Sequence, residues 1–183
     1  MRKAKYIATC TAMIMVTLFA AASFNNEPKH IEIVSASFNN EPKHIEIVYT
    51  DLTKDARKQV DCLADNIYYE AGHEPEAGKQ AVALVTMNRT QDERYPSNIC
   101  EVVKQKTKGT CQFSWFCLKN KVHRDNDAYK QSMKVALFVY ANYDKIRDIT
   151  QGALFYHADY VNPKWRGLVK TTKIGRHIFY KET

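Results

Sequence analysis

The sequence predicts an α+β fold in which helices come first and a small antiparallel sheet follows towards the C-terminus. Three runs between residues 55 and 144 repeat apolar residues at helical spacing, and β-like runs dominate the end of the chain. With 183 residues, of which 45% are hydrophobic, the chain has enough apolar material for one domain with a core. This composition excludes a wholly disordered or collagen-like protein.

The first helix is expected from Asp55 to Tyr69, because its apolar residues recur at spacings of three, four and seven. Gly72 ends this pattern and favours a stop there. A second helix is expected from Pro75, a favoured first-turn residue, to about Asn88. A third amphipathic run extends from Asp127 to about Asp144.

The remaining segments are expected to be extended. Gly175 lies between the last two of these runs and predicts a hairpin turn. The β-like runs cover residues 99–103, 111–116, 153–157, 169–173 and 177–180.

The N-terminus predicts export. Residues 1–22 combine a basic start, an apolar run of about 15 residues and three final alanines, which is the order of a secretory signal peptide. The run is short for a bilayer span, and a retained membrane anchor is the alternative. We therefore expect the protein in the periplasm, the cell wall or the medium, encoded by a bacterium or by a phage.

An identical 13-residue unit occurs at residues 22–34 and again at 36–48. Two short copies do not make a solenoid, which needs at least three repeats that share a core. We interpret residues 23–50 as a duplicated tether without chemistry and residues 51–183 as the working domain.

Cysteine usage agrees with export. Removal of the signal leaves an even set, which an oxidising compartment favours as two disulfides; the four residues are Cys62, Cys100, Cys111 and Cys117. Three pairings are possible, and free buried thiols or a structural zinc site are the alternatives. The zinc alternative lacks a C-x2-C pair.

Glu70 is the candidate catalytic residue. It falls in the last turn of the first expected helix, beside Tyr68 and Tyr69. Desolvation by the rings and the negative end of the helix dipole would both raise its pKa. A carboxyl group that stays protonated near neutral pH can protonate a glycosidic oxygen. The alternative is an ordinary solvated surface glutamate.

The stretch around Glu70 resembles the SleB-type cell-wall hydrolases, the spore-cortex-lytic group of peptidoglycan-cleaving enzymes. The motif reads Ile-Tyr-x-Glu-Ala-x-x-Glu-Pro from Ile67 to Pro75, followed by Gly-x-x-Ala-Val-Ala-x-Val-x-x-Asn-Arg ending at Arg89. Further motifs follow in the family's order at residues 95–96, 112–114, 153–156 and 174–179. The resemblance covers about residues 60–180.

The resemblance implies a compact lysozyme-like domain similar to lytic transglycosylases, which cut between N-acetylmuramic acid and N-acetylglucosamine. It places the family's catalytic glutamate on Glu70, which would act first as acid and then as base while a 1,6-anhydro ring closes. A second carboxylate, which ordinary glycosidases require, is then unnecessary. The sequence departs from the family where Gly72 and His73 replace the usual Arg of its Glu-Ala-Arg-Gly segment.

Several further residues are candidates for holding the glycan. Alternation along an expected strand would turn some polar and aromatic side chains towards the substrate and others into the core. Glu74 is the nearest second carboxylate, and helix capping is the favoured role for it. The substrate-binding candidates are Tyr69, Gln112, Ser114, Trp115, Tyr156 and His157.

Two other function classes stay open. A zinc amidase would need three protein ligands, and the six histidines show no H-E-x-x-H spacing. A non-catalytic wall-binding module would use the same groove with an inert Glu70. The formal charge of +7 falls to +4 without the three basic residues of the signal, and the cations form no cluster on a predicted face. We therefore expect a monomer that binds peptidoglycan, with no nucleic acid, no cofactor and no metal, and membrane contact only through an uncleaved signal.

Overall fold

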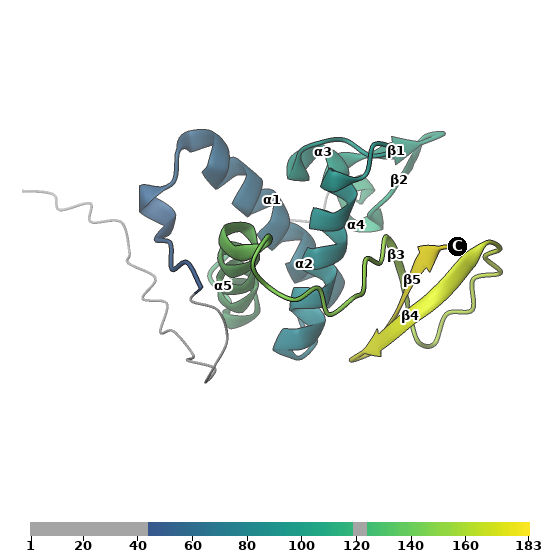
Figure 1. The fold of residues 1–183 in the computed structure, drawn as a ribbon. Helices are drawn as coiled ribbons and strands as arrows, with labels where there is room; N and C mark the ends of the chain where they lie inside the picture. Colours follow the sequence, from purple (N-terminus) through teal and green to yellow (C-terminus); the bar gives the residue numbers. More distant parts are fainter. Residues whose placement is uncertain (1–43, 119–123) are drawn as a thin grey trace, which may run out of the picture. The chain divides into compact units, whose positions relative to one another are not determined.

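The computed structural model describes residues 44–118 and 124–183 (Figure 1). The expected signal peptide and most of the duplicated tether lie outside the described residues, so both stay predictions. None of the described helices is long and apolar enough to cross a bilayer.

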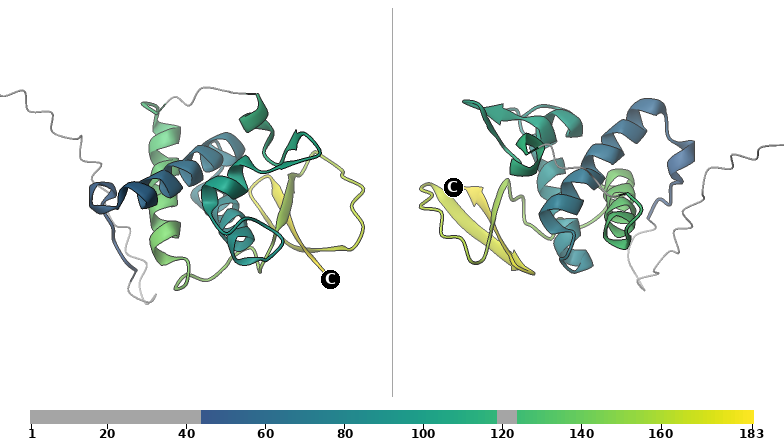
Figure 2. Two further views of the ribbon diagram at one scale, coloured as in Figure 1. Left: turned by 90° about the horizontal axis from the view of Figure 1, so that it is seen from above. Right: turned by 180° about the vertical axis from the view of Figure 1, so that it is seen from behind.

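Three helices form the larger core. They are α1 (Lys54–Ala71), α2 (Glu76–Gln91) and α5 (Asp127–Asn142), and each packs against the other two. Figure 2 shows α1 crossing α5 in the view from above. The side chains of Leu63, Leu84 and Leu137 are almost fully buried among them. A short 3-10 helix, η1 (Tyr49–Asp51), precedes α1. The three helices predicted from apolar spacing are therefore present, with ends that differ from the prediction by at most three residues.

The expected strand at residues 99–103 is wrong, because this segment forms the helix α3 (Ile99–Lys104). The side chain of Asn98 accepts a hydrogen bond from the backbone N–H of Glu101 at 3.0 Å and caps the helix. Ile99, Val102 and Val103 then share one buried face at spacings of three and four.

The expected strand at residues 111–116 is also mostly wrong. Only β2 (Thr110–Cys111) is extended, paired with β1 (Lys106–Thr107), and the helix α4 (Ser114–Cys117) follows. The alternation expected through Gln112, Ser114 and Trp115 therefore does not exist.

The C-terminal sheet agrees with the sequence prediction. It has three antiparallel strands in the order β3 (Phe155–Ala158), β5 (His177–Glu182) and β4 (Leu168–Ile174). Phe179, on its inner face, is fully buried against Ala81 and Val85 of α2. As Figures 1 and 2 show, α2 lies between the sheet and α5. This packing brings β3 towards the end of α1.

The predicted hairpin turn fits closely against the loop between α1 and α2. Gly175 has φ +55°, and a Cβ added there would overlap the Glu74 carboxylate. The same carboxylate accepts a hydrogen bond from the Arg176 backbone N–H at 3.0 Å. Glu74 does not cap α2, whose N-cap is Pro75 without a side-chain hydrogen bond. The capping role predicted for Glu74 is therefore replaced by a tie to the hairpin.

The four cysteines form two disulfides. Cys62–Cys100 joins α1 to α3 across 38 residues, and Cys111–Cys117 closes a segment of six residues. In the chain-entropy description, a cross-link stabilises more when it closes a longer loop of the unfolded chain.

We expect the Cys62→Ser/Cys100→Ser variant to lose about 4 kcal/mol of unfolding free energy, against about 2 kcal/mol for Cys111→Ser/Cys117→Ser. Urea unfolding under oxidising conditions measures both losses. Thiol counting on the denatured exported protein, from which the signal with Cys10 has been removed, is the control. Four reactive thiols, or equal losses in the two variants, would contradict this assignment.

Candidate active site

Glu70 lies in the last turn of α1, with its carboxyl group turned towards the sheet rather than to open water. The Tyr156 hydroxyl of β3 donates a hydrogen bond to Glu70 Oε2 at 3.1 Å. This contact joins residues 86 positions apart, and it exists because the sheet packs on α2 beside the end of α1. Glu70 is partly buried.

Burial raises the pKa of the Glu70 carboxyl above its ordinary value. The hydrogen bond from Tyr156 and the positive charge of Arg89 both oppose this rise in pKa, but desolvation is the largest contribution. Glu70 is thus protonated over a wider pH range than a solvated glutamate. This is the state in which a carboxyl group can act as an acid.

Tyr156 is fixed by rings on the inner face of the sheet. Its ring lies 5.3 Å from the His177 ring and 5.7 Å from the Phe179 ring, centroid to centroid. Burial and the nearby Glu70 raise the pKa of Tyr156 well above its ordinary value. The phenol therefore stays protonated and remains a hydrogen-bond donor to Glu70.

A buried cation supports this pair from α2. Arg89 is 2% exposed, and its Nε and Nη2 atoms donate to the Leu154 carbonyl at 2.9 and 2.7 Å. The guanidinium carbon lies 5.2 Å from the centre of the Tyr95 ring and 5.4 Å from that of Phe113. Arg89 Nη1 has no hydrogen-bond partner among the described residues. Arg89 ends the second sequence motif, but no role was predicted for it from the sequence.

An aromatic platform, formed by Tyr69 and Trp115, lies at the C-terminal turns of α1. The rings of Tyr69 and Trp115 stack with centroids 4.6 Å apart and planes 16° apart. Trp115 Nε1 donates to the Asn66 side chain at 3.1 Å, and Asn66 in turn donates to Thr86 at 3.1 Å. This buried chain of hydrogen bonds fixes the position of the platform; Asn66 and Thr86 were not foreseen as parts of the site.

The other predicted substrate-binding residues are less closely tied to Glu70. Gln112 and Ser114 are exposed on either side of the buried Phe113. His157 lies on the opposite face of β3 from Tyr156, since successive side chains of a strand point to opposite faces. Its ring nitrogens contact the Ala158 carbonyl at 2.8 Å and the Tyr180 hydroxyl at 3.0 Å. Of the candidates, Tyr156 contacts Glu70 directly, whereas Trp115 contacts Asn66, one turn before Glu70 on α1. His157 lies on the other face of the sheet.

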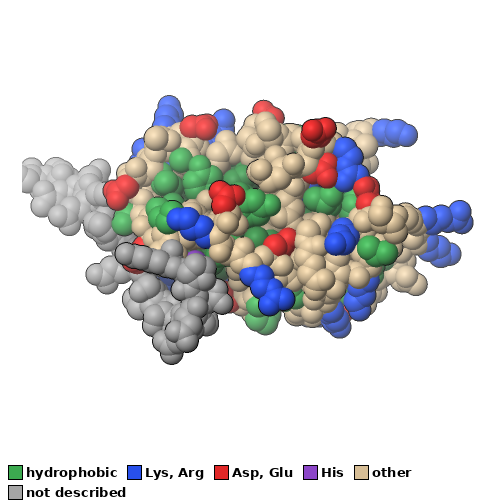
Figure 3. Space-filling view, in the orientation of Figure 1, with side chains coloured by type: hydrophobic (Ala, Val, Ile, Leu, Met, Phe, Trp, Pro, Cys, Tyr) green, Lys and Arg blue, Asp and Glu red, His purple; other side chains and the backbone are tan. Residues whose placement is uncertain are grey.

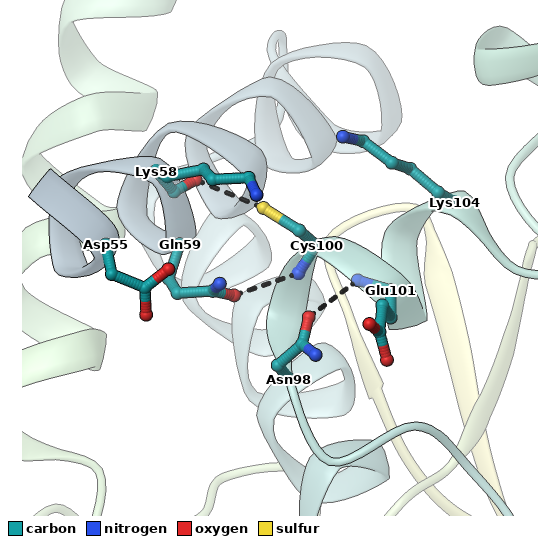
Figure 4. A pocket seen from close by; sticks show the side chains of 7 residues that line it. All are labelled: Asp55, Lys58, Gln59, Asn98, Cys100, Glu101 and Lys104. Carbon is teal, nitrogen blue, oxygen red and sulfur yellow. Dashed lines mark hydrogen bonds between the residues drawn. The ribbon is translucent and has the colours of Figure 1, made fainter.

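A pocket drawn in Figure 4 lies between α1 and α3, away from this group of residues. Its walls are polar, and Gln59 there accepts a hydrogen bond from the Cys100 backbone N–H at 3.0 Å. Glu70 does not line it. The described residues also contain no group of three or more His, Cys, Asp or Glu side chains placed to hold a metal ion.

Comparison with known proteins finds a matching family model and solved structures with a similar fold. A family model described as Cell Wall Hydrolase matches residues 73–180, a range that begins just after Glu70. The catalytic domain of the germination-specific lytic transglycosylase SleB from Bacillus anthracis is 26% identical, with a TM-score of 0.52. That match covers 72% of this chain and 98% of the other.

A second solved structure shows the same fold. The catalytic domain of the Bacillus cereus SleB protein is 23% identical, with a TM-score of 0.53, over 80% of this chain and all of that domain. No curated protein sequence matches the chain.

Proposed function

Because the chain belongs to the cell wall hydrolase family, we propose that it cleaves the glycan strands of peptidoglycan with Glu70 as its catalytic acid. The observation that carries this proposal is the partly buried Glu70 carboxyl, whose pKa is raised and which the Tyr156 hydroxyl orients at 3.1 Å. The similarity to a lytic transglycosylase catalytic domain supports the substrate class.

The reaction proposed is a transglycosylation within the sugar. Neutral Glu70 donates its proton to the glycosidic oxygen as the bond from that oxygen to C1 of N-acetylmuramic acid breaks. The resulting carboxylate removes the proton of the C6 hydroxyl of the same sugar, whose oxygen bonds to C1 and closes the 1,6-anhydro ring. The proton balance is complete with one carboxyl group, and no water is consumed.

The surroundings of Glu70 favour this single-carboxyl route over hydrolysis by a carboxylate pair. Two nearby acids on α1 and the following loop have other partners. The Glu74 carboxylate accepts from the Arg176 backbone, and Asp65 accepts a hydrogen bond from the Tyr129 hydroxyl at 3.2 Å. Each is thus held by a partner outside the Glu70–Tyr156 pair.

The stacked rings of Tyr69 and Trp115 are proposed to support a sugar of the bound strand. Trp115 is partly exposed, and its ring is held by the hydrogen bond to Asn66, so a sugar can contact it without ordering a mobile side chain. Two disulfides and the N-terminal sequence further support export to the wall as the place of action.

Mass analysis of digested peptidoglycan tests the proposal. We expect fragments that end in 1,6-anhydro-N-acetylmuramic acid. Reducing ends would instead indicate a hydrolytic muramidase, and freed stem peptides an amidase. Intact polymer after incubation with folded protein would indicate a binding module. Each of these three results would contradict the transglycosylase reaction.

A further inference from the structure

The positive charge of the chain is concentrated at its end. Residues 159–183 contain six Lys or Arg residues and two acids, a net charge of +4. Residues 23–158 contain 18 basic and 18 acidic residues and are neutral overall. Strand register places Lys170 and Lys173 on one face of the sheet and Lys181 on the other, so the excess charge belongs to this segment rather than to a single face. In Figure 3, lysine and arginine side chains gather at the right of the view, where Figure 1 places β4 and β5.

A group of rings lies on the outer face of the sheet. Strand register places Phe155 and Lys170 directly beside Tyr180, on the face opposite Phe179. His157 stacks on Tyr180 with ring centroids 5.2 Å apart. Trp165, from the loop between β3 and β4, lies 5.4 Å from the His157 ring and 5.6 Å from the Tyr180 ring.

Part of this ring group is open to solvent. Trp165, which contacts the His157 and Tyr180 rings, is 44% exposed, and Tyr160 and Val161 of the same loop are 77% and 44% exposed. Such a cluster of exposed apolar side chains, surrounded by polar residues, typically marks a binding surface.

The charges on this surface leave an excess of cations. Its two acids are paired, Asp159 with Lys173 at 3.0 Å and Glu182 with Arg94. Lys164, Arg166 and Lys170 form no ion pair with any described residue. A partner with negative charges and flat apolar faces would complement this surface.

We propose that the outer face of the sheet, formed by Trp165, His157, Tyr180 and Lys170, is a second binding surface for peptidoglycan. This inference rests on the proposed function, because the occupant is the same polymer. Sugar rings present apolar faces to Trp165, and the carboxylates of the stem peptides meet the unpaired cations. Glu70 acts beside Tyr156 on the inner face of β3, so the two sites lie on opposite faces of one sheet, and a polymer can contact both.

Peptidoglycan is favoured over a nucleic acid by the makeup of the surface. Three unpaired cations around a ring cluster suit a polymer with scattered charges, whereas a nucleic acid presents a phosphate at every nucleotide and requires a denser basic surface. Binding to DNA serves as a separate outcome of the test.

The test measures binding of the full chain to insoluble peptidoglycan stripped of teichoic acids, in a Glu70→Gln background that leaves the polymer intact. We expect Trp165→Ala to lower the fraction bound about five- to tenfold, since exposed aromatic anchors carry much of the affinity of such surfaces. Lys170→Glu should lower it about threefold at low salt and less at high salt. Ile45→Ala and Lys130→Glu, similar changes at exposed residues away from the sheet, are the matched controls and should bind normally.

A second measurement separates this inference from the proposed function. With Glu70 present, Trp165→Ala and Lys170→Glu should still cleave short soluble glycan fragments at the wild-type rate and lose activity only on the insoluble polymer.

Unchanged binding in Lys170→Glu, which alters only an exposed side chain, would overturn the inference even if Trp165→Ala fails to fold. Binding to DNA as tight as to peptidoglycan, or binding that requires teichoic acids, would also overturn it. Loss of cleavage by the wild type itself would refute the proposed function and leave the binding result interpretable.

Discussion

Replacing Glu70 with glutamine is expected to lower the rate of glycan cleavage by about 10^2- to 10^4-fold, the usual contribution of a positioned acid or base. The amide has nearly the shape of the carboxyl group, and its oxygen can still accept the Tyr156 hydroxyl hydrogen bond. It has no acidic proton for the glycosidic oxygen. Initial rates of soluble product release, at equal concentrations of folded protein, measure the loss.

Tyr156→Phe is the matched comparison, because it alters the partner and keeps the acid. The Tyr156 hydrogen bond lowers the pKa of Glu70, so its removal raises that pKa further. Cleavage requires protonated Glu70 in the first step, and activity therefore falls as the pH rises through its pKa. We expect this alkaline decline to move to higher pH in Tyr156→Phe, with much of the rate retained at lower pH.

The raised pKa of Glu70 also predicts how the stability of Glu70→Gln depends on pH. This measurement shows whether a loss of activity in the variant is due to the missing acid or to unfolding. A carboxyl group whose pKa is higher in the folded state stabilises the fold fully below its unfolded pKa, and this contribution is lost as the pH rises through the folded pKa. Glu70→Gln should thus unfold at a higher temperature than the wild type at pH 8 and at a similar one below about pH 4. A folded variant with wild-type activity would refute the role of Glu70.

The long elements could be predicted because their apolar residues repeat at regular spacing and their ends have local stop signals. The helix α3 could not, since its six residues span fewer than two turns and are rich in valine and isoleucine. Its local signal was Asn98, which caps the backbone of Glu101. At residues 111–116 the chain turns into α4 at Ser114, although its aromatic residues resemble those of a strand.

The part of the site that lies within one helix could also be predicted from local sequence. Glu70 and its neighbouring tyrosines are local in sequence, so their place at a helix end could be predicted. Its partner Tyr156 comes from a strand 86 residues later, and the choice between the faces of β3 depends on register. Alternation along the strand already separates Tyr156 from His157, so the grouping of both residues in one site was wrong, and the register decides which of them faces Glu70.

Arg89 is the residue whose role depends most on tertiary structure, and its replacement by methionine has the second large expected effect. The guanidinium joins α2 to the chain entering β3 through the two bonds to the Leu154 carbonyl. No other described residue donates to that carbonyl, so methionine would leave a buried acceptor unpaired. We expect a loss of about 2–4 kcal/mol in unfolding free energy, which denaturant titration measures.

Arg89→Lys distinguishes the charge from the geometry of the guanidinium. Arg89 lowers the pKa of Glu70 by its positive charge, so Arg89→Met should shift the alkaline decline of activity to higher pH. Lysine keeps the charge but has neither the paired donors nor the planar face that lies against the Tyr95 and Phe113 rings. Arg89→Lys should therefore lose stability while the pH profile stays near that of the wild type. A pH profile that is unchanged in folded Arg89→Met would show that this cation stabilises the fold without tuning the acid.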